Sequence, residues 1–300
     1  MNNSISIIIA TKNRPNSLII CLKSILNSTI KPLEIIVVDQ SNNQKTKKVV
    51  LILNKSLIKY FHLNSKGKSK SLNFAIKKAK GSLLAFTDDD CLVDKKWLEN
   101  IQNTFKKNQD ISLCFGKTLP HQPKKHKYEF CPCTFKKNPD KFSITSEPCK
   151  HWERVGFGNN MVIKKKVFKK VGLFKKWLGP GSVGSNAEDA ELINRSLINK
   201  FRIGYEPSVV IFHNKWLNEH QLRKQEWSYV CGEIACYGWF AFSGFKFAQK
   251  IVKDSTKKTL KSLTYRQNVP QHRCRNIWSQ ITAQLFGLLI AWITYLRKSA

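Results

Sequence analysis

The sequence predicts an α/β fold, in which a mostly parallel, Rossmann-like sheet is flanked by helices and followed by a helical C-terminal extension. Through residues 4–105, apolar runs of strand length alternate with segments whose apolar residues recur at helical spacing. Acidic residues stand directly after two of these runs, where the ligand sites of such sheets are found. Of the 300 residues, 42% are hydrophobic and 11% aromatic, which is enough apolar material for a globular core.

The first 63 residues predict strands and helices in alternation. In order, we predict strand Ser4–Ala10, a helix capped by Asn16 or Ser17, strand Glu34–Val38, a basic helix over 43–55 and strand Leu57–Leu63. The first two strands are uninterrupted apolar runs, which is typical of parallel strands buried on both faces. Because Asp39 follows the second strand, its carboxylate is expected at the carboxyl edge of the sheet.

Three consecutive acids follow the fourth predicted strand. A helix over Ser71–Lys80, closed by Gly81, leads to strand Leu83–Phe86 and then to Asp88–Asp90, after which Asp94 is expected to cap another helix. Like charges packed so closely repel one another strongly at low dielectric. A bound divalent cation would relieve that repulsion, because hard cations prefer carboxylate oxygens. A solvated acidic turn is the alternative.

The second half of the chain predicts less regular structure. Residues 118–150 show little periodicity and predict a long irregular insertion. The elements expected after it are regular structure over Gly156–Ile163, a short helix Lys164–Val171, a glycine-rich loop at 179–185, a helix Glu188–Asn199 and a strand Arg202–Phe212 ending at His213. We therefore expect an α/β domain over 1–217, with halves 1–117 and 118–217, and a separate tail over 218–300.

The tail is basic and rich in aromatic residues, and its last run, Asn276–Leu296, carries no charge. Arg273 and Arg275 precede this run, and Arg297 and Lys298 follow it. The run is long enough to span a bilayer, although several polar residues weaken that interpretation. A helix lying on the membrane surface and an ordinary buried helix both remain open.

Charge and cysteine content limit the classes of partner and the compartment that we expect for this protein. The chain has 52 Lys and Arg against 20 Asp and Glu, a net charge of +32, which favours nucleotide phosphates, anionic membranes or nucleic acid. No basic and then apolar leader is recognisable at Met1–Ser6, so the nine cysteines are expected as reduced thiols of a cytoplasmic protein. A structural zinc site is the alternative for one group, made up of Cys131, Cys133, Cys149 and His151.

A second acidic pair, Glu188 and Asp189, begins a predicted helix directly after the glycine-rich loop. Carboxylates in this position can act as general bases. They also complement the helix dipole, which is the structural alternative. The loop contains Gly179–Gly184, which satisfies G-x-G-x-x-G, but it follows no clear strand and holds Pro180. We therefore interpret it as a mobile wall of a site and not as a dinucleotide fingerprint.

Taken together, the motifs over about residues 4–215 resemble those of the family 2 glycosyltransferases, nucleotide-sugar-dependent enzymes of the GT-A fold. The matching segments, in the family's order, are Ser6–Pro15, Glu34–Ser41, Gly67 with Asn73, Gly81, Asp88–Asp90, Val171–Phe174, Glu188–Leu192 and His213. The resemblance implies that 1–117 is the nucleotide-sugar half and 118–217 the acceptor and catalytic half. It also implies an inverting transfer of a sugar to a glycan or lipid-linked hydroxyl acceptor.

The resemblance also implies a role for each matching residue. Those assigned to the nucleotide are Thr11, Arg14, Asp39, Lys66, Gly67 and Asn73, with Asp88 or Asp89 at the ribose or supporting the metal site. Asp90 and His213 would bind Mg²⁺ or Mn²⁺. Asp189 would be the catalytic base, oriented or replaced by Glu188. Gln40 stands where the family usually has a second acid, and Cys91 stands where many relatives have an acid or a small residue.

The expected donor is a nucleoside diphosphate sugar, with UDP favoured, and the expected location is the cytoplasmic face of a membrane, reached through the tail. The alternative from another class is a basic nucleic-acid-binding protein without enzymatic activity, which the charge and the aromatic residues would suit. No nucleic-acid motif accompanies them, so nucleic acid is not the expected partner.

Overall fold

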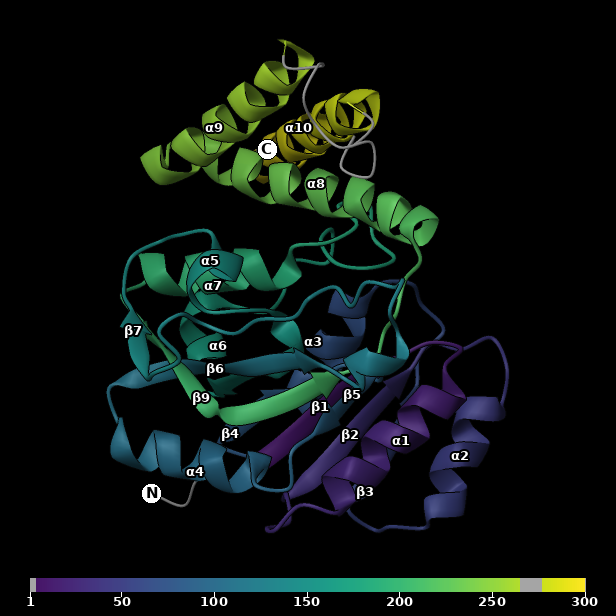
Figure 1. Ribbon diagram of the computed structural model, residues 1–300. Coiled ribbons are helices and arrows are strands. Elements are labelled where there is room, and N and C mark those ends of the chain that lie inside the picture. Colours follow the sequence, from purple (N-terminus) through teal and green to yellow (C-terminus); the bar gives the residue numbers. More distant parts are fainter. Residues whose placement is uncertain (1–3, 265–276, 300) are drawn as a thin grey trace.

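The computed structural model describes residues 4–264 and 277–299. Within these residues one sheet runs through the molecule in the order β3-β2-β1-β4-β8-β6-β9-β5, with β7 paired to β9 (Figure 1). The strands are β1 (Ile5–Thr11), β2 (Glu34–Asp39), β3 (Ile58–His62), β4 (Leu83–Phe86), β5 (Cys91–Val93), β6 (Ile111–Pro120), β7 (Ser143–Thr145), β8 (Met161–Lys164) and β9 (Arg202–His213).

The prediction of a mostly parallel sheet is confirmed, with three exceptions, the strands β5, β7 and β8. Strands β3, β2, β1 and β4 are parallel to one another, whereas β8 lies antiparallel between β4 and β6. Strands β6 and β9 are parallel, and β5 and β7 pair antiparallel with β9. Strand β8 is buried on both faces like its parallel neighbours, so its apolar run gives no sign of its opposite direction.

Helices cover both faces of the sheet. One face packs against α1 (Pro15–Leu26), α2 (Lys45–Leu53) and α4 (Trp97–Lys107), and the other against α3 (Lys68–Lys78), α6 (Val167–Val171) and α7 (Glu188–Ile198). The short helices η1 (Pro123–Lys125), α5 (His151–Arg154) and η2 (Gly158–Asn160) lie in the connections. Alternate residues of the buried strands therefore enter two separate cores, as the period of a strand requires.

Two predicted helix caps are wrong. Helix α1 begins at Pro15, with Arg14 at the N-cap, so neither Asn16 nor Ser17 caps it. Proline is well suited to this first position, because its fixed φ matches the helix and its missing N–H has no partner there anyway. Likewise, α4 begins at Trp97, with Lys96 at its N-cap, and the Asp94 carboxylate accepts a hydrogen bond from the Lys96 N–H at 2.8 Å.

The irregular insertion predicted over 118–150 is confirmed except for the end of β6 and the short strand β7. Strands β5 and β6 were not predicted. Strand β5 has three residues, and β6 is interrupted at Gly116, where its register with β9 shifts. A Cβ at Gly116 would overlap the carbonyl oxygen of Val209, so the close approach of β9 requires glycine there.

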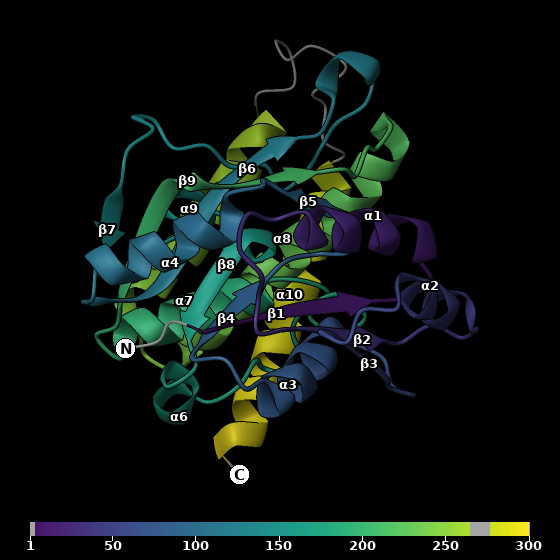
Figure 2. The same cartoon turned by 90° about the horizontal axis from the view of Figure 1, so that it is seen from below.

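The tail forms three helices: α8 (Glu219–Phe242), α9 (Lys246–Thr264) and α10 (Ile277–Ser299). Asn218 and Gln221 form a capping box at the start of α8. The three helices share an apolar core with the loop before α7, and Figures 1 and 2 show them as a layer on the α7 side of the sheet. The helical extension is thus confirmed, and it is packed onto the α/β domain.

Candidate active site

A cleft of about 1770 Å³ lies between the carboxyl edge of the sheet and the α8–α10 layer. Its floor comes from the ends of β1 and β4 and its wall from the loop 179–187, while α8, α9 and α10 provide the roof. The register of the sheet explains the floor, since Thr11 pairs with Asp39 and Ile8 with Phe86, which aligns the ends of β1, β2 and β4. The predicted acidic cluster follows β4 and opens into this cleft.

Asp89 is held by two partners from the end of β1. Thr11 Oγ1 donates a hydrogen bond to its carboxylate at 2.6 Å, and Arg14 Nη1 lies 3.0 Å from the other oxygen. Asp89 is buried, and burial raises its pKa to about 6 in spite of the opposing charge of Arg14. Thr11, Arg14 and Asp89 thus meet as predicted, and in this structure they bind one another.

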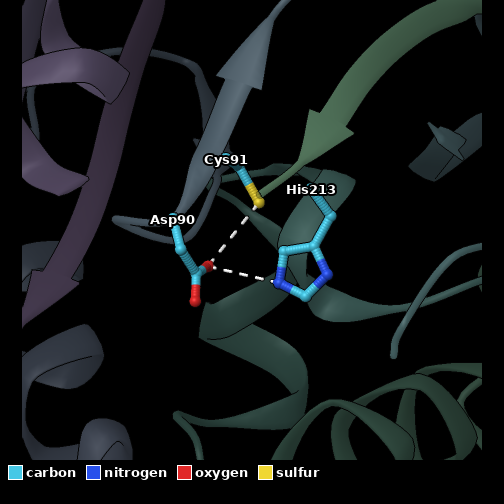
Figure 3. A group of neighbouring side chains, drawn as sticks. All are labelled: Asp90, Cys91 and His213. Atoms are coloured by element: carbon cyan, nitrogen blue, oxygen red, sulfur yellow. Dashed lines mark hydrogen bonds and ion pairs between the residues drawn. The ribbon is translucent and has the colours of Figure 1, made fainter. Parts of the chain in front are cut away.

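Asp90 joins Arg14 to His213. One carboxylate oxygen lies 2.9 Å from Arg14 Nη1. The other lies 3.3 Å from His213 Nε2 (Figure 3). The pairing of β5 with β9 produces this meeting, since it sets Cys91 opposite His213. Burial opposes ionisation of Asp90, but its hydrogen bond to His213 and the nearby positive charges hold its pKa well below its usual range. Conversely, burial would lower the pKa of His213, but Asp90 raises it to about 10.

The donors at this point fit a divalent cation. Asp90, Cys91 and His213 are the group of metal-ligating side chains that gathers within 4.8 Å in the described residues. A carboxylate and an imidazole suit Mn²⁺ or Mg²⁺. Burial raises the pKa of the Cys91 thiol well above its usual value, so Cys91 offers no thiolate. The other ring nitrogen of His213, Nδ1, lies 2.6 Å from the Pro132 carbonyl oxygen, which can accept its hydrogen. In that neutral tautomer Nε2 carries the lone pair that could bind a metal ion.

Lys68 connects the acidic cluster with the second acidic pair. Its ammonium lies 2.6 Å from Asp88 and 3.5 Å from Glu188. The prediction had chosen Lys66, which is exposed and does not line the cleft. Gly67 lies at the cleft as predicted, with φ +112, and the next N–H, that of Lys68, bonds to the Pro180 carbonyl at 2.9 Å. The glycine-rich loop is thereby attached to the start of α3.

Asp189 and Glu188 differ in their surroundings. The Asp189 carboxylate accepts hydrogen bonds from the backbone N–H groups of Gly158 and Ala190, at 2.7 and 2.8 Å, and remains partly exposed in the cleft. Glu188 is buried, and burial raises its pKa to about 7 although Lys68 acts in the opposite direction. Before this pair, Ala187 has φ +68, an uncommon conformation for a residue with a side chain. The backbone therefore fixes where the two acids point.

Two predicted nucleotide-binding residues lie away from the cleft. Asp39 is fully buried, and its carboxylate accepts bonds from the N–H and hydroxyl of Ser41 and from the Tyr60 hydroxyl. The Asn73 amide bonds to both main-chain groups of Phe174, at 2.8 and 2.9 Å. In both residues the polar atoms hold other segments in place. Gln40, which replaces the acid of the family pattern, lines the cleft where Asp39 was expected.

The three cysteines proposed for zinc do not gather in the described part of the chain. Cys131 contacts His213, Cys133 contacts the Tyr229 hydroxyl at 3.1 Å, and the backbone of Cys149 bonds to Asn194. The side chain of His151 lies outside the described residues. The described cysteines carry free thiols, as expected. Cys131 was not predicted to lie beside the candidate metal ligands, and nothing in the local sequence signals its contact with His213.

Comparison with known proteins gives a consistent result. Residues 6–172 match the family model described as Glycosyl transferase family 2. An uncharacterized glycosyltransferase of Rickettsia typhi is 30% identical over 176 residues, 58% of this chain and 54% of the relative. A GalNAc(5)-diNAcBac-PP-undecaprenol beta-1,3-glucosyltransferase of Campylobacter jejuni is 36% identical over 120 residues, 38% of each chain. The chain thus spans about half or less of the length of these curated relatives.

Two solved structures share the fold. A mannosyltransferase from Pyrobaculum calidifontis, in complex with GDP-Man and Mn²⁺, superposes with a TM-score of 0.62 at 15% identity, covering 99% of this chain and 88% of the other. Residues 1–349 of TarS from S. aureus, in complex with UDP-GlcNAc, give a TM-score of 0.54 at 20% identity, covering 73% and 60%. At these identities the likeness concerns the GT-A fold.

Proposed function

Since the chain belongs to glycosyl transferase family 2 and is a glycosyltransferase, we propose that it moves a sugar, with inversion, from a nucleoside diphosphate donor to a hydroxyl acceptor. The observation that carries the proposal is the shared cleft: Asp90 and His213, which fit a divalent cation, face the same space as the partly exposed carboxylate of Asp189. One site can then hold the donor diphosphate and activate the acceptor.

At the donor end, Asp90 and His213 would hold Mg²⁺ or Mn²⁺, which supplies positive charge against the departing diphosphate. In this structure Arg14 donates hydrogen bonds to Asp89 and Asp90. With a cation bound beside these acids, the Arg14 guanidinium would be available to bind a phosphate of the donor. Lys68 lies at the start of α3, whose N-terminal N–H groups also favour anions. Gln40 and Thr11, which line the cleft floor, would contact the nucleoside.

At the acceptor end, Asp189 would take the proton from the attacking hydroxyl. Its two backbone hydrogen bonds orient the carboxylate, and its partial exposure lets an acceptor reach it. Glu188 is too deeply buried for direct contact with an acceptor. Together with Lys68 it would hold the start of α7, and thereby Asp189, in position. Attack opposite the leaving nucleotide gives inversion in a single displacement.

The acceptor is proposed to be a glycan or a lipid-linked saccharide at the cytoplasmic face of an anionic membrane, as part of polysaccharide or glycolipid synthesis. The Campylobacter jejuni relative, by its name, acts on an undecaprenol-linked substrate. The net charge of +32 supports the anionic surface. The donor is proposed to be a UDP-sugar. Among the structural neighbours, UDP-GlcNAc in one complex favours UDP and GDP-Man in the other favours GDP.

Calorimetric titration of UDP, GDP and dTDP, each with and without Mn²⁺, tests the proposal. We expect metal-dependent binding of one nucleotide, lost in Asp90→Ala and retained in Asp110→Ala, which removes an exposed acid far from the cleft. Equal binding by Asp90→Ala and the wild type would refute the metal assignment. Absence of binding for all three nucleotides would refute the donor site.

A further inference from the structure

The outward surface of α10 is apolar, the reverse of what a surface helix in water requires. Large hydrophobic side chains with exposed fractions from 41% to 70% lie along this side. We call them the apolar face, and they are Trp278, Leu285, Phe286, Leu289, Trp292, Ile293 and Leu296. Their spacing keeps them on one side of the helix for about 27 Å, at 1.5 Å per residue. So large a contiguous apolar surface indicates a partner.

The opposite side of α10 is small and polar and packs along α8. Ala283 and Ala291 are fully buried, and a Cβ at Gly287 would come within 2.6 Å of the Cys231 carbonyl oxygen in α8. The Gln284 amide, also buried, donates a hydrogen bond to Thr259 of α9 at 2.8 Å. The helix is therefore attached along its length to the domain by contacts that would be lost if it moved into a bilayer core.

The neighbouring helix α9 carries a row of exposed lysines on its outward side. We call this row the lysine stripe, and it contains Lys246, Lys250, Lys253, Lys257 and Lys261. The spacing of three or four residues places them on one face, opposite the buried Ala248 and Ile251. Figure 1 shows α9 and α10 together on the side of α8 that faces away from the sheet. The lysine stripe and the apolar face therefore point outward from the same layer.

We propose that the apolar face and the lysine stripe together dock the protein flat on an anionic bilayer, with α10 lying in the plane of the interface. Aromatic and aliphatic side chains would enter the headgroup and upper acyl region, while the lysines bind anionic headgroups. This inference deepens the proposed function. The docking surface stands without that function, and only the route by which an acceptor would reach the cleft rests on it. A second copy of the chain is a poor occupant, because two surfaces of such positive charge repel each other.

A spanning arrangement fits the contacts less well. The stretch Trp278–Arg297 has the length and mean hydropathy, 1.3, of a membrane span. However, spanning would remove Gln284 from Thr259 and expose the buried face of α8, which contains Cys231, Ile234 and Ala235. In-plane docking keeps every one of these contacts and covers the surface that water now meets.

This orientation places the cleft beside the lipid. Trp278, at the start of the apolar face, also lines the cleft, as does Lys258 of α9. A substrate anchored in the bilayer by its lipid could then present its saccharide to the cleft without leaving the membrane. The geometry thus favours a lipid-linked acceptor over a free glycan for the site that Asp189 faces.

Flotation of the full chain with vesicles of phosphatidylcholine, with and without phosphatidylglycerol, tests the docking surface. Leu285→Glu with Leu289→Glu should lower binding by about tenfold or more, because two anchoring side chains are lost. The matched control is Leu51→Glu with Ile52→Glu, which alters equally exposed apolar residues on α2 and should change little. Unaltered flotation of the α10 variant would overturn the proposal.

The lysine stripe is tested by charge reversal. Lys250→Glu, Lys253→Glu and Lys257→Glu together should weaken binding to anionic vesicles by about a hundredfold, at roughly 1 kcal/mol per lysine contact. The corresponding reversal of the exposed α2 lysines, at 45, 47 and 48, should have a much smaller effect. An equal loss in both variants would show that general charge, and not this stripe, attracts the membrane, and would overturn the lysine part of the proposal.

Quenching of tryptophan by brominated lipids separates in-plane docking from spanning. In-plane docking predicts that Trp278→Phe and Trp292→Phe remove quenching from the same shallow depth. A spanning helix would place these positions about 21 Å apart along its axis, and so at different depths. Nucleotide titration of the Leu285→Glu, Leu289→Glu variant is an independent control, because neither residue lines the cleft. Normal nucleotide binding together with lost flotation would show that the two changes affect docking alone. Different depths for the two tryptophans, or a wild type that self-associates without binding vesicles, would overturn the inference.

Discussion

Replacing Asp189 with asparagine separates the chemistry of the site from its stability. An asparagine keeps one carbonyl oxygen, but it turns an NH₂ group toward one of the two backbone N–H groups that now bind the carboxylate, those of Gly158 and Ala190. One charge-assisted hydrogen bond is therefore lost. Such a bond contributes about 1.5–3 kcal/mol, so the free energy of unfolding should fall by about 2 kcal/mol and the chain should remain folded.

The effect on turnover should be far larger. A general base contributes about 10²- to 10⁴-fold, so kcat of Asp189→Asn should fall by that factor, which is about 3–5 kcal/mol of activation free energy. Release of nucleoside diphosphate measures the rate, and calorimetry measures donor binding, which should stay unchanged because Asp90 and His213 are untouched. Asp110→Asn is the matched control. Wild-type turnover by a folded Asp189→Asn would refute the assignment, and loss of turnover in Glu188→Gln alone would transfer the role to Glu188.

Three further predictions concern the neighbours of this residue. Glu188 should cost the wild type up to about 3 kcal/mol of unfolding free energy between pH 4.5 and 7, because its raised pKa means that the folded state binds its proton more tightly than the unfolded chain. Urea unfolding of Glu188→Gln should show a loss that is smaller by this amount, while Asp89, whose pKa is also raised, keeps its own contribution. Asn73→Ala should destabilise the fold by about 2 kcal/mol, since the buried main chain of Phe174 loses both partners, with unchanged nucleotide affinity by calorimetry. Lys68→Ala should weaken nucleotide binding in the same assay, whereas Lys66→Ala should not.

Each of these has a clear contrary result. A pH dependence of stability in Glu188→Gln equal to that of the wild type would assign the titration to another group. Weaker nucleotide binding by a stable Asn73→Ala would restore the role that the sequence motif implied for that residue. Equal losses in Lys66→Ala and Lys68→Ala would mean that the lysines act through general charge and not through the contact of Lys68 with Asp88.

The sequence could predict that the candidate metal ligands lie together, because they stand at strand ends. The cluster Asp88–Asp90 follows β4 directly, and His213 ends β9, so the topology of the sheet brings them to one edge. The contact of Asp90 with His213 depends on β5, which is too short to show a pattern. The expectation that Asp90 and His213 lie close together came from the family resemblance alone. The fold class followed from alternating runs, whereas the antiparallel direction of β5, β7 and β8 did not.

Side-chain direction near the site could not be predicted. Lys66 and Lys68 are two residues apart in a lysine-rich chain, and only the positive φ of Gly67 and the start of α3 decide which one enters the cleft. Asn73 and Asp39 match the motif, but partners elsewhere in the chain occupy their polar atoms: Phe174 lies about a hundred residues from Asn73, and Tyr60 lies on the neighbouring strand from Asp39. Such long-range pairings leave no local signal.

The two ends of the cleft are connected through the start of α3, and this connection bears on how the donor could prepare catalysis. Lys68 contacts Asp88 on the donor side and Glu188 on the catalytic side, and its own N–H holds Pro180 of the wall. The next residue, Ser69, donates a hydrogen bond to the Leu178 carbonyl at 2.7 Å. A phosphate that attracts the Lys68 ammonium would weaken its hold on Glu188, whose burial then favours the protonated form more strongly. Donor binding would thereby change the charge beside Asp189 before any acceptor arrives.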